Sequence, residues 1–474
     1  MSPDIARSAP SRPWRTAISQ PGNQPQEADQ LRELLRRPEY RRTLVLSALI
    51  GVPVSLLAFW FLVALHELER LLWQVLPERF GWAAPAWWWP LPLLTLAGAA
   101  VGLVATRLPG RGGHIPAGGL HPEGQSPAAL PGVVFAALAS LPLGAVLGPE
   151  APLIAFGGGV ALLFRALVRR PAAPGSNALL GAAGSAAAIA TIFGNPVVAA
   201  VLLMEVAGVG GPRLFAVMLP ALLASGVGDI VFTGFGRWTG LQTARLDIGL
   251  PRPSTLDTGD VVWGVLLALA VGAVVHLIVS GGRAVAGFVS GRPLPRTVLC
   301  ALAAGACAAV YALTTGRTPE DVASSGQAAL ARMAADPQAW PAGALGAVLL
   351  CKGAGYALCL GSLRGGPVFP SLFLGGAAGL LAAPLPGFGV VPAMAAGMAA
   401  AAAAAMRLPV SSVVLVVLLL GNADSVPVVV LAVVVAFVVV ELLPPGPDIP
   451  PLPPPGGGPP SAPGRAPRPV SSRP

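Results

Sequence analysis

Residues 146–159, with the sequence VLGPEAPLIAFGGG, decide how the rest of the chain is interpreted. This stretch places one glutamate, Glu150, between two prolines inside an apolar run. Proline is favoured in the first turn of a helix, so the stretch predicts a helix that begins close to Glu150. A carboxylate at the depth of a lipid bilayer is costly, and such a residue commonly has a partner or a function. Glu150 is therefore the first candidate for a functional side chain.

The composition of the chain is that of a membrane protein. Of its 474 residues, 54% are hydrophobic and only 11% are charged, whereas a soluble protein carries roughly a quarter charged residues. The clearest segments that are long and apolar enough to span a bilayer are 43–64, 87–106, 261–279 and 410–443. The sequence therefore predicts an all-α polytopic membrane protein.

Charge and proline content predict the domain layout. Residues 1–40 are expected to be a disordered, basic cytoplasmic segment, and the Pro/Gly-rich residues 444–474 a disordered tail. Two membrane halves, 43–237 and 260–443, lie between them. Arginines before the first apolar segment favour the cytoplasmic side, so both termini are expected there. The net charge is +9. The basic residues that produce it flank the spans and form no patch interleaved with aromatic residues, so nucleic-acid binding is not expected.

Many of the 59 glycines and 52 prolines interrupt apolar stretches. Irregular backbone at membrane depth survives only where it is buried in protein or lines a cavity, and interrupted segments in both halves of a chain are typical of transporters. Stretches 112–120, 148–154 and 365–376 each predict a helix start within the membrane. The free N–H groups and the positive dipole end of such starts attract anions. Glu150 could compete for that anion position as a gate; the alternative is a helix-capping glutamate that faces a water-filled vestibule.

Five motifs in order resemble the ClC family of chloride channels and transporters. GPEAP (148–152) is similar to the family's G-(K/R)-E-G-P, whose glutamate is the gating residue, and GGHIP (112–116) resembles G-S-G-I-P. GGPVFP (365–370) resembles the G-(x)-F-x-P stretch, and FGNPVVAAVLLMEV (193–206) resembles the F-N-A-P helix. MRLP (406–409), followed by an apolar run and Asp424, resembles the last of the family's motifs in sequence order. The resemblance covers residues 43–443.

This resemblance implies a ClC-type fold of about 18 helices in two inverted halves with broken helices. It also implies a homodimer in which each subunit has its own pore for chloride or another small anion, with no cofactor and no metal. The expected setting is membrane lipid of a bacterial inner membrane, and no regulatory domain is expected after the membrane region. Beside the gating residue Glu150, the implied anion-binding positions are Gly113, His114, Ile115, Pro116, Gly148, Pro149, Ala151, Pro152, Gly366, Pro367, Val368, Phe369 and Pro370.

The chain departs from the family pattern at four positions. Gly113 replaces the central serine, while the adjacent His114 could donate a hydrogen bond, respond to pH, or simply bond a loop carbonyl. No tyrosine follows the last apolar segment, and Pro149 replaces a basic residue. The inner proton-relay position reads Glu205-Val206, and valine cannot carry a proton. Glu205 is interpreted as structural, with proton handling as the alternative.

Two cationic residues, one within an apolar segment and one before a glycine break, and four cysteines leave alternatives open. Lys352, the only lysine, could add to the positive field near the anion route or extend to a membrane interface. Arg364 could strengthen anion attraction or anchor an interface. The cysteines lie in apolar segments without neighbouring histidines, which favours buried free thiols over a metal site.

The sequence thus predicts passive, voltage-gated chloride channel activity with Glu150 as the gating residue. The alternative within transport is an anion/proton antiporter for chloride or fluoride. An enzyme is not expected, because the four histidines are scattered and His66-Glu67 lacks the second histidine of a metal-binding helix motif. A purely structural scaffold gives no reason for Glu150 or for the repeated helix starts.

Overall fold

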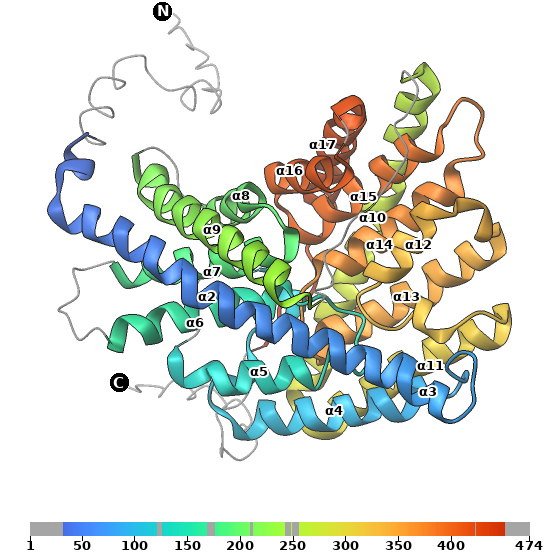
Figure 1. Ribbon diagram of the computed structural model, residues 1–474. Coiled ribbons are helices and arrows are strands. Elements are labelled where there is room, and N and C mark those ends of the chain that lie inside the picture. Colours follow the sequence, from blue (N-terminus) through green and yellow to red (C-terminus); the bar gives the residue numbers. More distant parts are fainter. Residues whose placement is uncertain are drawn as a thin grey trace, which may run out of the picture.

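The computed structural model describes residues 32–120, 126–167, 176–208, 212–241, 248, 256–421 and 423–450. Most of the expected disordered segment 1–40 and residues 451–474 of the expected tail lie outside this range. Within it the chain is helical, and its one β-type contact is an isolated antiparallel bridge between Gly148 and Gly366. The expected all-α membrane fold is confirmed (Figure 1).

The first part of the chain forms helices of unequal length. They are α2 (Pro38–Arg70), which continues through a π-helix (Leu71–Val75) into α3 (Leu76–Arg79), then α4 (Pro90–Arg107), α5 (Leu130–Leu138), α6 (Glu150–Leu167), α7 (Ser176–Phe193), α8 (Pro196–Ala207) and α9 (Pro212–Thr239). The expected span 43–64 falls inside α2, and the expected span 87–106 corresponds to α4.

The second part repeats this mixture of long and short helices. They are α10 (Thr258–Gly291), α11 (Pro293–Thr315), α12 (Gln327–Ala335), α13 (Ala342–Ser362), α14 (Val368–Ala382), α15 (Val390–Met406), α16 (Pro409–Leu420) and α17 (Val426–Leu442). The apolar segment 410–443 is not one span. Gly421, at φ 60°, ends α16, and a 3-10 turn at Ala423–Ser425 precedes α17.

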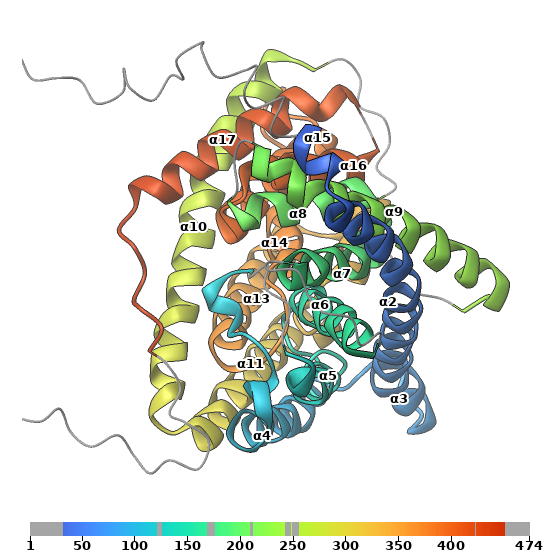
Figure 2. The ribbon, with the colours of Figure 1, turned by 90° about the vertical axis from the view of Figure 1, so that its left-hand side faces the viewer.

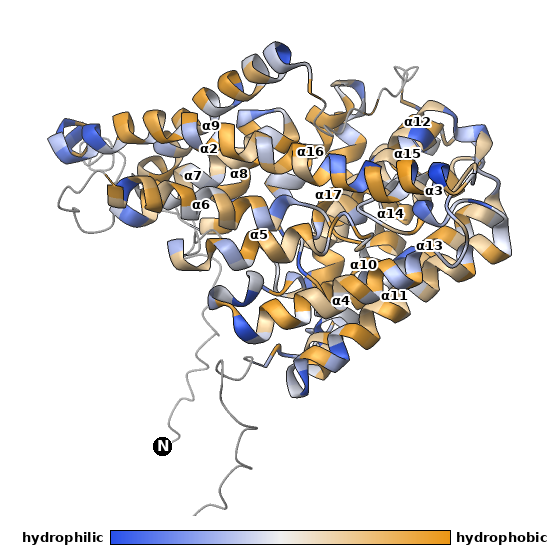
Figure 3. Cartoon of the chain, turned by 60° about the horizontal axis from the view of Figure 1, so that its bottom comes forward, coloured by the Kyte–Doolittle hydropathy of each residue, from blue (hydrophilic) through white to orange (hydrophobic). Residues whose placement is uncertain are grey.

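Among the described residues, nine helices are long and apolar enough to cross a membrane, and several shorter apolar helices lie between them. Large hydrophobic side chains such as Ile230, Leu277 and Leu350 are exposed, and much of the helical ribbon has the colours of hydrophobic residues in Figure 3. Because lipid is the solvent that tolerates such a surface, the chain is an integral membrane protein.

The helices pack as two groups. In the first, α7 contacts α2, α6, α8 and α9; in the second, α10 and α15 contact each other and α17, and α10 also packs on α13. The two groups lie on opposite sides of Figure 1, and α4 packs along α11 to join them. The candidate site lies between these groups, where α6 and α14 begin.

Both helices that begin at the site pack closely on the helix that follows them. A Cβ atom on Gly157 of α6 would collide with the backbone oxygen of Gly184 in α7, and one on Gly375 of α14 would collide with that of Gly397 in α15. Only glycine permits this approach. The two glycine contacts therefore fix where the starts of α6 and α14 lie.

Candidate functional site

The segments before α6 and α14 are joined to each other. Gly148 N donates to Gly366 O at 2.8 Å, and Gly366 N donates to Gly148 O at 2.5 Å. These two bonds form the isolated bridge. The two predicted helix starts at 148–154 and 365–376, more than two hundred residues apart in the sequence, therefore meet at one place inside the molecule.

The Glu150 side chain crosses this junction. It is 1% exposed, and its Oε1 accepts a hydrogen bond from Phe369 N, in the first turn of α14, at 2.9 Å. Its Oε2 is buried and has no hydrogen-bond partner among the residues that the structure describes. The first turn of a helix favours a negative charge through its free N–H groups and its dipole. The carboxylate therefore lies where the start of α14 would attract an anion.

Glycines make room for this carboxylate. A Cβ atom on Gly366 would overlap Glu150 Oε2, and a Cβ on Gly148 would overlap both carboxylate oxygens. The space that holds the carboxylate is thus bounded by backbone on two sides. Any other residue at either position would push the side chain of Glu150 out of this space.

The predicted helix start at 112–120 is wrong. Residues Pro116–Gly118 form only a three-residue 3-10 turn, which ends at Gly119 with φ 89°. Gly112 and Gly113 before it also have positive φ values of 76° and 98°. These left-handed conformations suit glycine and interrupt a right-handed helix. The stretch is therefore an irregular loop, and it lacks the N-terminal field of a full helix.

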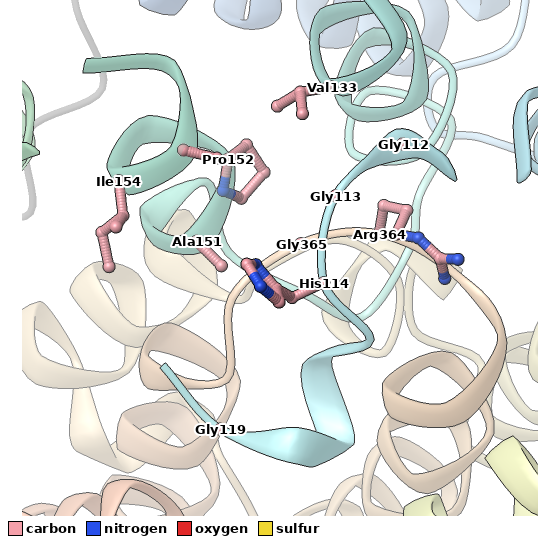
Figure 4. A pocket seen from close by; sticks show the side chains of 11 residues that line it. Gly112, Gly113, His114, Gly119, Val133, Ala151, Pro152, Ile154, Arg364 and Gly365 are labelled. Atoms are coloured by element: carbon pink, nitrogen blue, oxygen red, sulfur yellow. The ribbon is translucent and has the colours of Figure 1, made fainter. Parts of the chain in front are cut away.

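This loop nevertheless faces the start of α6 across a small cavity of about 20 Å³, room for one water-sized particle. Figure 4 shows the loop residues Gly113 and His114 opposite Ala151, Pro152 and Gly365. Four of the sequence-predicted positions, Gly113, His114, Ala151 and Pro152, line this cavity. The other predicted positions do not line it. Ile115, Pro149 and the bridge residues Gly148 and Gly366 are outside its lining, Pro116 and Pro367 line a second cavity, and Val368, Phe369 and Pro370 are buried in the first turn of α14.

Arg364 is a buried arginine in the lining of the same small cavity, and in Figure 4 its guanidinium group points away from His114 and Ala151. Its side chain is 4% exposed, its Nε donates to Arg111 O at 3.3 Å and its Nη1 to Leu363 O at 3.1 Å. The residue lines the cavity beside Gly365. Of the two interpretations that the sequence leaves open, this burial does not fit an anchor at a membrane interface.

Tyr356 is a site residue that the sequence analysis missed. It is fully buried in α13, and its hydroxyl donates to Pro367 O at 2.7 Å. Pro367 directly follows Gly366 and precedes α14, so this bond holds the backbone that faces the carboxylate. The sequence did contain a signal for this role: a tyrosine lies inside an apolar segment, eleven residues before the proline of a Gly-Pro break. A buried hydroxyl requires a hydrogen-bond partner, and the backbone at such a break can provide one.

Lys352 has neither of the two predicted roles. It is fully buried one turn before Tyr356, and its Nζ lies within 2.9–3.3 Å of four backbone oxygens, those of Asp321, Val322, Ala323 and Ser324. It also lies 4.7 Å from the ring centroid of Phe373 in α14. The ammonium group of this α13 residue therefore holds the loop 321–324 and α14 in place, and its charge is stabilised by the loop carbonyl groups.

Glu205 and Val206 lie near the end of α8, and Glu205 caps another helix. Glu205 accepts from Val410 N at 3.0 Å, Ser411 N at 2.7 Å and Ser411 Oγ at 2.6 Å, all at the start of α16. Both of its carboxylate oxygens are used in this cap. The geometry agrees with a structural role. The Phe193 ring, at the other end of the same motif, lies 5.7 Å from that of Phe369 and so reaches the site.

No cluster of three or more histidine, cysteine or acidic side chains suited to a metal occurs within the described part of the chain. All four cysteines are free thiols, with Cys300 and Cys359 buried.

Comparison with known proteins gives the same picture. Residues 117–441 match the family described as voltage gated chloride channel. YfeO of Salmonella choleraesuis (strain SC-B67), whose name proposes a role in ion transport, is 32% identical over 199 residues, which are 40% of this chain and 47% of that protein. The aligned part of the chain thus spans about half the length of this curated relative.

Solved structures share the fold. A slow cyanobacterial Cl⁻/H⁺ antiporter has a TM-score of 0.69 at 21% identity, covering 84% of this chain and 94% of that one. A CLC-type fluoride/proton antiporter has a TM-score of 0.63 at 19% identity, covering 85% and 95%. The fold and the paired helix starts define a membrane protein of the channel and transporter class. The chain belongs to the voltage-gated chloride channel (ClC) family.

Proposed function

We propose that this protein moves small anions across the membrane and that Glu150 is its gate. The single observation that supports this most is the place of the Glu150 carboxylate, bonded to Phe369 N at the start of α14. That place combines a helix dipole, a backbone N–H donor and a glycine-bounded space. The same N–H donor would also suit a halide ion. The carboxylate of Glu150 and a halide would therefore compete for this position.

The proposed mechanism is an exchange of two negative charges. With Glu150 in place, Phe369 N is satisfied and the position is blocked. When an anion enters from the small cavity lined by Gly113, His114 and Arg364, it competes for the same field and the side chain of Glu150 turns away. Backbone N–H groups bind an ion less tightly than a cage of lysines would, which suits conduction because the ion must also leave.

Passive chloride conduction is the form of transport we favour. Val206 offers no titratable group at the inner relay position, and both oxygens of Glu205 are engaged at α16. A second candidate is anion/proton antiport with chloride or fluoride. It is supported by the structural likeness to two proteins that are named as antiporters and by Glu150 itself, which can take up a proton.

Flux from liposomes loaded with chloride or fluoride tests both candidates. We expect anion efflux that changes strongly in Glu150→Gln, without stoichiometric proton movement, while the exposed Glu78→Gln behaves as wild type. Uphill proton uptake driven by an anion gradient would replace the channel by the antiporter. An absence of anion flux in wild-type liposomes would remove the transport proposal altogether.

We further propose a homodimer in a bacterial inner membrane with both termini cytoplasmic. The orientation is supported by Arg36, Arg37, Arg41 and Arg42, which are all exposed around the start of α2. Mass measurement of the detergent-solubilised protein tests the dimer. Protease accessibility of a tag at either end, in inverted and right-side-out vesicles, tests the orientation.

A further inference from the structure

Directly after α2, residues Leu71–Val75 form the one π-helix in the part of the chain that the structure describes. Figure 2 shows α2 continuing through it into α3 along one side of the molecule, beside α6 and α7. π-helical turns are rare and are frequent at functional sites, yet the exchange proposed at Glu150 gives this one no role. The buried residue of the π-helix is Trp73.

Trp73 reaches the segment that leads to the gate. Its side chain is 1% exposed, and its Nε1 donates to Pro142 O at 3.0 Å. Pro142 belongs to the irregular residues 139–149 between α5 and α6. A Cβ atom on Gly144, at φ 101°, would lie only 2.6 Å from Cζ2 of Trp73. The indole therefore donates to this segment and also packs directly on its backbone.

The segment needs partners of this kind, because residues 140–148 are all buried. Irregular backbone at membrane depth persists only where protein surrounds it and satisfies its polar groups, and a buried carbonyl without a donor is destabilising. Ser324 N donates to Gly144 O at 3.0 Å and ties the segment to the second half of the chain. Trp73 ties it to α2, in the first half.

These contacts bear on the place of the gating carboxylate. The main-chain bridge at Gly148 fixes the segment two residues before Glu150. A chain held at that point alone could still turn about it, whereas further fixed points at Pro142 and Gly144 set the direction in which the chain enters α6. That direction decides whether the carboxylate of Glu150 comes within 2.9 Å of Phe369 N.

The π-helix is itself braced by the residue before α4. Trp89 is 8% exposed, and its Nε1 donates to Leu72 O at 3.0 Å. The ring of Trp89 packs edge-on against those of Trp82 and Trp88, with centroids 5.7 and 5.8 Å apart. The backbone that carries Trp73 is therefore held from both sides.

We propose that Trp73 is a positioning residue of the transport site. Held by the π-helix, it fixes the segment before α6 so that the carboxylate of Glu150 meets Phe369 N. It acts through the main chain between Pro142 and Gly148. The inference rests on the proposed function, because it concerns the carboxylate that this function takes as the gate. Loosening the contact at Pro142 should make this carboxylate easier for an anion to displace.

Anion flux from liposomes tests this role with Trp73→Phe, which keeps an aromatic ring but removes the donor to Pro142. We expect the half-saturating anion concentration to fall about fivefold, because part of a hydrogen bond worth about tenfold is lost at Glu150. In the Glu150→Gln background, Trp73→Phe should leave the half-saturating concentration unchanged, since no carboxylate then competes with the anion. A merely structural tryptophan would act equally in both backgrounds.

Trp263→Phe is the matched control. Its indole also donates to a proline carbonyl, Pro386 O, at 3.0 Å, but beyond the end of α14 that is distant from Glu150. Both variants lose one indole hydrogen bond and should lose similar stability, whereas only Trp73→Phe should shift the half-saturating concentration. Equal half-saturation in the two variants, or the same fivefold shift of Trp73→Phe in the Glu150→Gln background, would overturn the inference.

A structure of the Trp73→Phe variant separates this inference from the proposed function. We expect the side chain of Glu150 to be divided between its place at Phe369 N and a second position, while it keeps one place in Trp263→Phe. An unmoved carboxylate in Trp73→Phe would refute positioning by Trp73. If wild type moves no anion, the proposed function fails, while a displaced carboxylate in Trp73→Phe would still support the inference.

Discussion

The starts of α6 and α14 are alike in construction but differ in what they carry. Each follows glycine and proline, and each helix packs through a glycine against the next helix. The start of α6 carries the acid, Glu150, whose Oε2 has no hydrogen-bond partner within the described part of the chain. The start of α14 carries no charge and is braced from α13 by Tyr356 and Lys352. The first half supplies the carboxylate that competes with the anion, and the second half supplies the rigid backbone that binds this carboxylate.

This difference predicts that variants on the α14 side change stability, whereas variants that displace the acid change flux. The largest effect is expected for Lys352→Met. Four backbone oxygens would lose their common donor, and each buried acceptor left unpaired costs about 1–3 kcal/mol. We expect a loss of at least about 3 kcal/mol in the free energy of unfolding, measured by denaturant titration in detergent. The control Arg107→Met, at an exposed position, should change it by less than about 0.5 kcal/mol; a similar small change for Lys352→Met would show that the α14 start does not depend on this brace.

Gly366→Ala should act on the acid instead. Its Cβ would occupy the space of Glu150 Oε2, so the carboxylate would lose its bond to Phe369 N. A hydrogen bond to a charged group is worth about 1.5–3 kcal/mol, so the ratio of open to blocked sites should change by about tenfold or more in liposome flux.

Two further variants sharpen that result. Combining Gly366→Ala with Glu150→Gln should add nothing to Glu150→Gln alone, because both remove the same contact. Gly343→Ala, in α13 with no atom near the added methyl group, serves as the control. Additive effects in the double variant would mean that Gly366 acts on something other than the carboxylate.

Glu205→Ala should lower stability by about 1–2 kcal/mol, since the start of α16 loses its cap. Glu205→Gln keeps an acceptor and should lose less. Neither variant should alter the ratio of protons to anions moved in the flux assay. A changed ratio would assign proton handling to Glu205 and contradict its structural role.

The smallest effect is expected for Tyr356→Phe, which removes one hydroxyl bond and should cost about 1 kcal/mol. Tyr40→Phe is the matched control, because the Tyr40 hydroxyl also bonds backbone oxygens, at 3.2 and 3.3 Å, far from Glu150 in sequence and at the start of α2. Only Tyr356→Phe should change anion flux as well, because Pro367 directly follows Gly366, the residue that faces the Glu150 carboxylate. Identical flux in both variants would leave Tyr356 with a purely structural role.

The membrane class, the break at Glu150 and the break before α14 were predictable from the sequence, because proline, glycine and apolar runs act locally. The loop at 112–120 was not, since the same residue types also form left-handed turns and the choice depends on Gly119. Residue types and spacing did not predict the partner of Glu150 either; only the family resemblance placed Phe369 among the anion-binding positions. Phe369 N is a backbone atom, which leaves no trace in the residue type, and only the fold brings it within 2.9 Å. The carbonyls around Lys352 escaped prediction for the same reason.

The bridge between Gly148 and Gly366 has a consequence for how the protein switches. Two main-chain bonds fasten the halves together directly beside the acid. Opening by separation of the halves would have to break both, whereas rotation about the torsions of one glutamate breaks neither. Switching should therefore be fast and local, with little change in molecular shape, and scattering profiles of the open and blocked forms should coincide.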